Sequence, residues 1–123
     1  MKSLPFSKRQ VYQPKEHDIQ TMIIQYLRLK GFYVWRHNSG MIAATNKYGK
    51  RRMIKMGVAG MPDVFALKGG RLYGIEVKRP KGIVTVLQEG QLAELTKHGA
   101  ITMVAHSVEE VQEVITRYER STV

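Results

Sequence analysis

Residues 62–78, PDVFALKGGRLYGIEVK, predict a β-hairpin that turns at Gly69-Gly70. Two apolar runs rich in β-branched and aromatic residues flank the pair of glycines, a pattern typical of a two-residue hairpin turn. This turn places Lys68 opposite Arg71 and so fixes every other pair. In the resulting register, apolar residues face one another along both strands, so packing alone favours it.

The same register places Asp63 directly opposite Glu76, with their Cβ atoms about 4.5–5.5 Å apart. Lys78 shares the Glu76 face of its strand, because side chains alternate along a strand. Two opposed carboxylates repel each other unless a proton or a cation lies between them. Three interpretations follow: an acid–base pair that shares a proton, a divalent metal site, or an ion pair between Lys78 and Glu76 that leaves Asp63 unexplained.

The rest of the chain predicts one α/β domain over residues 14–123, preceded by a basic arm over residues 1–13,. We expect a small mixed sheet flanked by helices. The predicted elements are helices over 15–30, 85–98 and 107–118, and strands over 32–37, 62–68, 71–78 and 100–106. Residues 38–60 are expected to form a loop with a short strand near 52–56, and Trp35 is expected in the core.

The composition excludes several classes of protein. The chain has 123 residues and no cysteine, so disulfides and thiolate metal sites are excluded,. The cytoplasm is the expected compartment, or the host cytoplasm if a phage encodes the protein. No apolar run approaches the roughly 20 residues that span a bilayer, and the N-terminus lacks a signal-peptide pattern. No membrane partner is therefore expected.

Charge is unevenly distributed along the sequence. The net charge is +10, and residues 1–81 carry 17 basic and 4 acidic side chains against 3 and 6 in residues 82–123. Such asymmetry suggests a basic face for a polyanion, most often nucleic acid, although a generally basic surface is the alternative. With a basic face around it, a metal at Asp63 and Glu76 would act on a phosphodiester, and Lys78 would orient water or stabilise phosphate charge.

At this point the chain resembles the PD-(D/E)XK nuclease superfamily and, more narrowly, the VRR-NUC domain of viral, phage and repair nucleases. Pro62-Asp63 is followed, after twelve residues, by Glu76-Val77-Lys78. The matching stretches are EHDIQ at 16–20, GVAGMPDVFAL at 57–67, YGIEVKRPKGIVTVLQ at 73–88 and HSVEEV at 106–111. The resemblance implies a restriction-endonuclease-like core of order αβββαβ.

The resemblance also implies roles for individual residues. Asp63 and Glu76 match the metal-binding acids, Lys78 the active-site lysine, and the Val77 carbonyl a group that completes the shell of Mg²⁺ or Mn²⁺. Glu16 matches an acid on the first helix that reaches the metal directly or through water. Its other interpretation is a first-turn carboxylate favoured by the helix dipole.

Gln88 matches a glutamine of the family that positions the lysine or a phosphate. It also completes a capping box with Thr85, three residues earlier, at the start of a helix. The two roles can coexist.

Basic residues beyond the motif are expected to contact DNA phosphates, which gives affinity without sequence preference. A solvated charge run is the alternative. The expected contacts are Lys47, Lys50, Arg51, Arg52, Lys55, Arg79 and Lys81.

The function implied by the resemblance is a metal-dependent DNA endonuclease that hydrolyses phosphodiester bonds and selects branched DNA over a particular sequence. Single-domain members resemble Holliday-junction resolvases, which implies a homodimer with a role in DNA repair. Two alternatives stay open: a non-catalytic nucleic-acid-binding module on a nuclease fold, and a metal-dependent ribonuclease.

Overall fold

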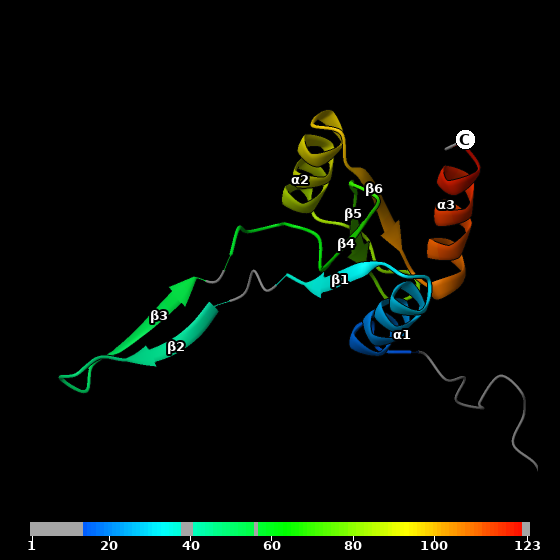
Figure 1. Ribbon diagram of the computed structural model, residues 1–123. Helices are drawn as coiled ribbons and strands as arrows, with labels where there is room; N and C mark the ends of the chain where they lie inside the picture. The colour runs from blue at the N-terminus through cyan, green and yellow to red at the C-terminus, as the bar shows by residue number, and fades with distance from the viewer. Residues whose placement is uncertain (1–13, 38–40, 56, 122–123) are drawn as a thin grey trace, which may run out of the picture.

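Three helices and six strands make up the described part of the chain, residues 14–37, 41–55 and 57–121 of the computed structural model (Figure 1). The helices are α1 (Glu16–Leu29), α2 (Val86–Lys97) and α3 (Val108–Ser121), and the strands are β1 (Tyr33–Arg36), β2 (Met41–Thr45), β3 (Arg51–Lys55), β4 (Val64–Lys68), β5 (Arg71–Val77) and β6 (Ile101–Ala105). The expected arm, residues 1–13, lies outside the described residues. No helix in this part of the chain is long and apolar enough to cross a membrane.

Four strands form a mixed sheet in the order β1-β4-β5-β6. Strand β4 pairs antiparallel with β1 and β5, and β6 runs parallel to β5. The predicted hairpin is confirmed, because Lys68 pairs with Arg71 and the other pairs follow in the expected register. Gly69 and Gly70 have φ values of +58° and +77°, which suit glycine at a tight hairpin turn,. The predicted mixed α/β class is therefore confirmed.

One face of the sheet packs against α1 and α3 and forms the core. Its buried residues come from α1 (Ile19, Ile23, Ile24, Leu27), from the strands (Val34, Val64, Ala66, Ile75, Val77, Ala105) and from α3 (Val111, Ile115). The helical residues recur at the spacing of one helix face, and the strand residues alternate. Glu76, which lies between Ile75 and Val77, therefore points to the opposite face of the sheet, the face that α2 covers.

Helix α2 covers only half of that second face. It packs on β5 and β6, where Thr96 Oγ1 lies 2.6 Å from Thr102 Oγ1, and it makes no contact with β1 or β4. Trp35 was expected in the core and does stack on Phe65, with ring centroids 5.6 Å apart, but 36% of its surface stays exposed. Tyr33, beside it, is 71% exposed. On this face the edge strand β1 is thus left uncovered, whereas Phe65 of β4 is only 8% exposed beneath the Trp35 ring.

Residues 41–55 form a second hairpin that the sequence analysis did not predict. The short strand expected near residues 52–56 is present as β3, but β2 pairs with it along its whole length, where a loop was expected. This hairpin contacts no other helix or strand of the described chain and stands away from the main sheet (Figure 1). The alternation that reveals a half-buried strand is absent here because neither strand packs against the core.

Candidate active site

Asp63 and Glu76 come together at one end of the β4–β5 pair. Asp63 directly precedes β4, and Glu76 is the second-last residue of β5. Oδ2 of Asp63 accepts a hydrogen bond from the Val77 backbone nitrogen at 2.9 Å. The Asp63 carbonyl accepts another from the His37 backbone nitrogen, also at 2.9 Å. Asp63 is therefore fixed between β1 and β5, with its carboxylate turned toward the strand that carries Glu76.

The Glu76 carboxylate is buried and lacks hydrogen bonds. Its side chain is 1% exposed, and neither oxygen has a hydrogen-bond partner in the described part of the chain. The Lys78 ammonium lies 3.7 Å from Oε1, which is within range of an ion pair but too long for a good hydrogen bond,. Because a buried carboxylate is costly without close partners, this ion pair alone leaves the group poorly satisfied. Both oxygens remain available to a further partner.

Negative charge accumulates around Glu76. Its pKa is raised from 4.5 to about 8, first by burial and next by the charge of Asp63, while the charge of Lys78 lowers it. A hydrogen bond between the Glu76 and Asp63 side chains, which needs a proton on one of them, also raises the pKa, and so does the charge of Glu16. A proton or a cation between the carboxylates would relieve this repulsion. The proton-sharing pair and the metal site therefore both fit the geometry.

Glu16 lies at the first position of α1, near enough for its charge to act on Glu76. The described residues nevertheless contain no group of three His, Cys, Asp or Glu side chains arranged to hold a metal ion. The acids that the structure brings together are thus Asp63 and Glu76, joined through the Val77 peptide. Glu16 belongs to the electrostatic surroundings of this pair, which suits contact through water rather than direct ligation.

The loop before Asp63 is fixed against α2. Gly60 has a φ of +79°, and a Cβ atom there would lie 2.7 Å from Cγ of Leu87, so only glycine fits,. Gln91 of α2 donates a hydrogen bond to the Ala59 carbonyl at 3.1 Å. Pro62 is fully buried. These contacts explain the GMP sequence before Asp63, because they set the point at which the chain enters β4.

The loop after Lys78 is fixed against β6 and the residue that follows it, His106. The Lys78 backbone nitrogen donates to the Ala105 carbonyl at 2.9 Å, and Gly82 N donates to the Arg79 carbonyl at 2.8 Å, closing a tight turn. A ring nitrogen of His106, Nε2, lies 3.1 Å from the Gly82 carbonyl. This turn carries Arg79 and Lys81, two of the expected DNA contacts, directly after Lys78.

A surface hollow lies between this turn and the start of α1. Its lining residues are Pro14, Lys15, Arg79, Pro80, Lys81 and Gly82. Three cations therefore surround one hollow next to the end of β5, an arrangement suited to a phosphate group. Lys15 was not among the predicted contacts, because its proximity depends on how α1 packs and not on the local sequence. The resemblance placed Glu16 at this site, and Lys15 could have been predicted because it directly precedes Glu16.

The Gln88 side chain caps the start of α2. Its Oε1 accepts from the Thr85 backbone nitrogen at 2.9 Å, and Thr85 Oγ1 accepts from the Gln88 backbone nitrogen at 3.1 Å. The capping-box interpretation is thus confirmed. The catalytic role stays a prediction and would fall to the side-chain amide nitrogen.

The remaining predicted DNA contacts gather on the β2–β3 hairpin and not at the carboxylates. Lys47 and Lys50 lie at its tip, and Arg51 and Arg52 lie on β3, all four exposed. Lys55 ends β3, and its side chain lies outside the described part of the structure. The structure therefore divides the expected cations between this hairpin and the hollow beside Lys78.

His37 is a site residue that the sequence analysis did not assign. It continues β1 beside Asp63, and its Nε2 is buried without a hydrogen-bond partner in the described residues. Its ring meets the Phe65 ring edge-on, with centroids 5.8 Å apart. The pairing of β1 with β4 would have revealed this neighbour, but the sequence alone does not set that register.

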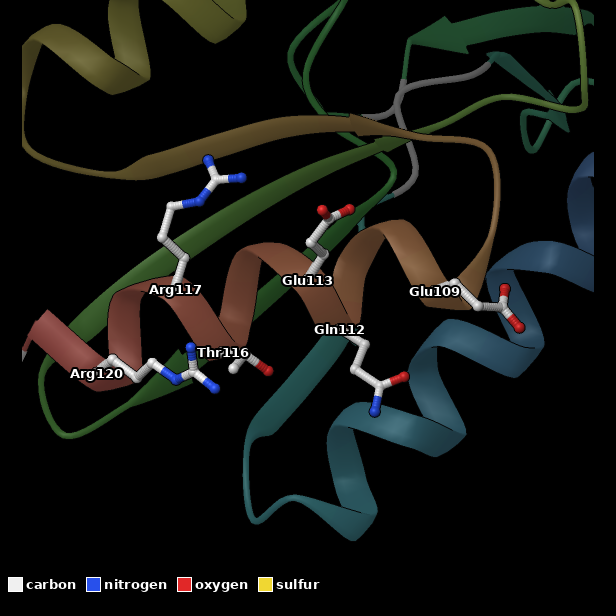
Figure 2. A pocket seen from close by; sticks show the side chains of 6 residues that line it. All are labelled: Glu109, Gln112, Glu113, Thr116, Arg117 and Arg120. Carbon is white, nitrogen blue, oxygen red and sulfur yellow. The ribbon is translucent and has the colours of Figure 1, made fainter.

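A larger hollow runs along the outer face of α3 (Figure 2). It is lined by Glu109, Gln112, Glu113, Thr116, Arg117 and Arg120. All six side chains come from one helix and none belongs to the site described above. This hollow is an exposed helix face and not a catalytic cleft.

No protein-family model matches the chain, and no curated protein is similar to it at a significant level.

Proposed function

We propose that this protein is a divalent-metal-dependent DNA endonuclease with the αβββαβ core of restriction endonucleases and VRR-NUC domains. One observation carries the proposal: the buried Glu76 carboxyl lies beside the Asp63 carboxylate, and both of its oxygens lack a hydrogen-bond donor in the described part of the chain. Two oxygen donors that repel each other suit a hard cation such as Mg²⁺ or Mn²⁺. Lys78, on the same face of the strand, supplies the positive charge that phosphate chemistry uses.

The proposed roles follow from the positions of these side chains. Asp63 and Glu76 would hold the metal, with the Val77 carbonyl and waters completing its shell. When bound, the metal supplies a coordinated water of lowered pKa and neutralises charge on the phosphate. Lys78, whose side chain is 14% exposed, would orient the attacking water or stabilise the phosphate. Glu16 would reach the metal shell through water.

The reaction is hydrolysis of a phosphodiester. The water oxygen bonds to phosphorus, one phosphorus–oxygen ester bond breaks, and the leaving oxygen receives a proton. Lys15, Arg79 and Lys81 would hold a neighbouring phosphate in the hollow beside Lys78. Such contacts carry no information about bases, so they would give affinity without sequence preference.

We also propose that the enzyme acts as a homodimer in the cytoplasm, on branched DNA that arises in repair. Strand β1 lies at an edge of the sheet, and Tyr33 and Trp35 are exposed on its uncovered face. A second copy placed there would cover an apolar surface and present a second site to the other DNA strand. A monomeric mass by light scattering, with cleavage of four-way DNA intact, contradicts the dimer.

The main experiment compares cleavage of linear, flapped and four-way DNA with Mg²⁺, with Mn²⁺ and with chelator. Wild type should cleave only with metal, and Lys78→Ala and Glu76→Gln should lose cleavage. The matched control is Glu94→Gln, an exposed carboxylate on α2 that should cleave as wild type does. Equal cleavage by Lys78→Ala and wild type contradicts the proposal.

A non-catalytic nucleic-acid-binding module is the second candidate. One observation favours it: Lys47, Lys50, Arg51 and Arg52 are exposed on a hairpin that contacts no other helix or strand of the described chain. That alternative expects metal-independent binding that Asp63→Ala leaves unchanged, with no cleavage by wild type. A matched pair of DNA and RNA substrates separates the deoxyribonuclease from the metal-dependent ribonuclease.

A further inference from the structure

The tip of the β2–β3 hairpin is held in one shape by hydrogen bonds. Oδ1 of Asn46 accepts from the backbone nitrogens of Tyr48 and Lys50, at 2.9 and 3.0 Å. Asn46 N donates to the Lys50 carbonyl, and Gly49 N donates to the Asn46 carbonyl, each at 3.0 Å. Gly49 has a φ of +77°, which glycine adopts without strain,. A hairpin that contacts no other element therefore keeps an ordered tip.

This tip presents an aromatic ring to solvent. Tyr48 is 81% exposed, and its ring contacts the Lys47 ammonium, which lies 5.1 Å from the ring centroid. Large aromatic side chains usually bury most of their area, whereas Tyr48 exposes most of its surface,. The Lys47 ammonium lies over one face of the ring, and most of the remaining surface of Tyr48 is exposed to solvent.

Positive charge surrounds the ring and continues down the hairpin. Residues 41–55 include five basic side chains and no acidic one. Lys50, Arg51 and Arg52 follow Tyr48 along the chain and are exposed. Proteins that bind single-stranded nucleic acid combine aromatic rings, on which bases stack, with cations that pair with phosphates. The Tyr48 ring and the cations around it form the same combination.

We propose that the β2–β3 hairpin is a DNA-binding arm and that Tyr48 stacks on a base left unstacked at a branch point. The inference depends on the proposed function only in taking DNA as the ligand, and cleavage is not needed for it. Lys47, Lys50, Arg51 and Arg52 hold the flanking phosphates. A continuous duplex offers no free base face, so the ring gains contact only where stacking is interrupted.

The arm gives a physical reason for a preference for branched DNA. Phosphate contacts strengthen binding to every DNA alike, whereas the stacked ring strengthens binding only to DNA with an exposed base. Removing one stacking ring should weaken binding to branched DNA by about tenfold and leave linear duplex nearly unchanged.

The test is a binding measurement in chelator with the Lys78→Ala protein, so that no DNA is cut. Fluorescence anisotropy gives the Kd for linear and four-way DNA of matched sequence. Tyr48→Ala should lose about tenfold on four-way DNA and less than twofold on linear DNA, and Tyr48→Phe should retain wild-type binding. Leu29→Ala, the control, removes a large apolar side chain 88% exposed at the end of α1 and should leave the preference between the two DNAs unchanged.

A second readout locates the ring. The four-way DNA carries 2-aminopurine at the branch point. The fluorescence of this base should fall when the DNA binds protein with Tyr48 or with Tyr48→Phe, and should stay high when it binds Tyr48→Ala. Equal Kd values for wild type and Tyr48→Ala on both DNAs overturn the inference, as does a Tyr48→Phe protein as weak as Tyr48→Ala.

The binding data, together with the cleavage experiment on wild type, separate this inference from the proposed function. A preference for four-way DNA that depends on Tyr48, together with no cleavage by wild type in metal, supports the arm and contradicts the nuclease. Metal-dependent cleavage by wild type, together with a preference for four-way DNA that Tyr48→Ala does not change, supports the nuclease and contradicts the arm. Absence of binding to any DNA overturns both.

Discussion

The molecule contains two antiparallel hairpins of opposite character. The β4–β5 hairpin lies inside the sheet between β1 and β6, and it holds the carboxylates of Asp63 and Glu76. The β2–β3 hairpin contacts no other element and carries only positive charge. Each closes on a turn that uses glycine at positive φ, Gly69-Gly70 in the first and Gly49 in the second. The same local geometry thus serves a buried negative site and an exposed positive arm.

The difference between the hairpins lies in their surroundings. Around Glu76, burial removes water, so neighbouring charges act strongly and the pKa rises to about 8,. On the exposed hairpin, water and salt screen each cation, which suits phosphate contacts that form and break easily. We therefore expect substitutions in the buried hairpin to change chemistry and stability, and substitutions in the exposed hairpin to change affinity.

The largest expected effect is on cleavage by Lys78→Ala. Loss of its charge at the reacting phosphate should lower the cleavage rate on the order of 10²–10³-fold, with the Kd for DNA changed less than threefold. Single-turnover cleavage and anisotropy measure the two quantities on the same protein. A proportional loss of affinity would place Lys78 among the DNA-binding cations and break the distinction between the hairpins.

Alanine at Lys47, Lys50, Arg51 and Arg52 together should have the opposite effect. The loss of four phosphate contacts should make the slope of log K against log salt concentration shallower by about 3–4. DNA binding at low salt should weaken by about 3–4 decades at most. Cleavage at saturating DNA should stay within a few fold of wild type. A variant that binds normally but cleaves slowly would contradict the assignment of these residues.

The pH dependence of stability should reveal Glu76. Its pKa is raised from 4.5 to about 8 in the folded state, so the folded chain keeps a proton that the unfolded chain releases. Stability should therefore be highest below about pH 4.5 and fall as pH rises toward 8,. Glu76→Gln should remove this fall and stabilise the metal-free protein near pH 8 on the order of 2–4 kcal/mol.

Urea unfolding of metal-free protein at acidic and mildly alkaline pH measures this effect. Glu94→Gln is the control, since its side chain is 64% exposed. If the difference in unfolding free energy between wild type and Glu76→Gln is the same near pH 8 as near pH 4.5, Glu76 is not an uncompensated buried acid.

The smallest expected effects compare two glycines. Gly60→Ala should lower the free energy of unfolding by about 1–3 kcal/mol, because the residue has positive φ and its Cβ would meet Leu87,. Gly49 also has positive φ, but no atom lies within 4 Å of its Cβ position. Its change to alanine should disturb the arm without altering global unfolding. Thermal unfolding of both variants checks this, and equal losses would show that the arm folds with the sheet.

The sequence predicted the buried hairpin because two independent signals agreed there. Alternating apolar residues and the Gly69-Gly70 turn each specify one register, and that register placed Asp63 beside Glu76. The exposed hairpin gave no such signal, because neither of its strands buries a face and the residues of β2 show no alternation.

Other features depend on packing that local patterns do not contain. Trp35 stays partly exposed because α2 reaches only β5 and β6. Lys15 joins the hollow near Lys78 because of where α1 begins, and His37 meets Asp63 because of the β1–β4 register. Each required knowledge of which elements are neighbours.

Titration of metal-free protein with Mn²⁺ by calorimetry at pH 8 tests most directly whether Asp63 and Glu76 hold a cation. We expect wild type to bind Mn²⁺ and to release protons as it binds, because the metal displaces the proton on Glu76. Glu76→Gln should bind far more weakly, with no proton release. Binding by Glu76→Gln equal to wild type, or no binding by wild type, would contradict the account.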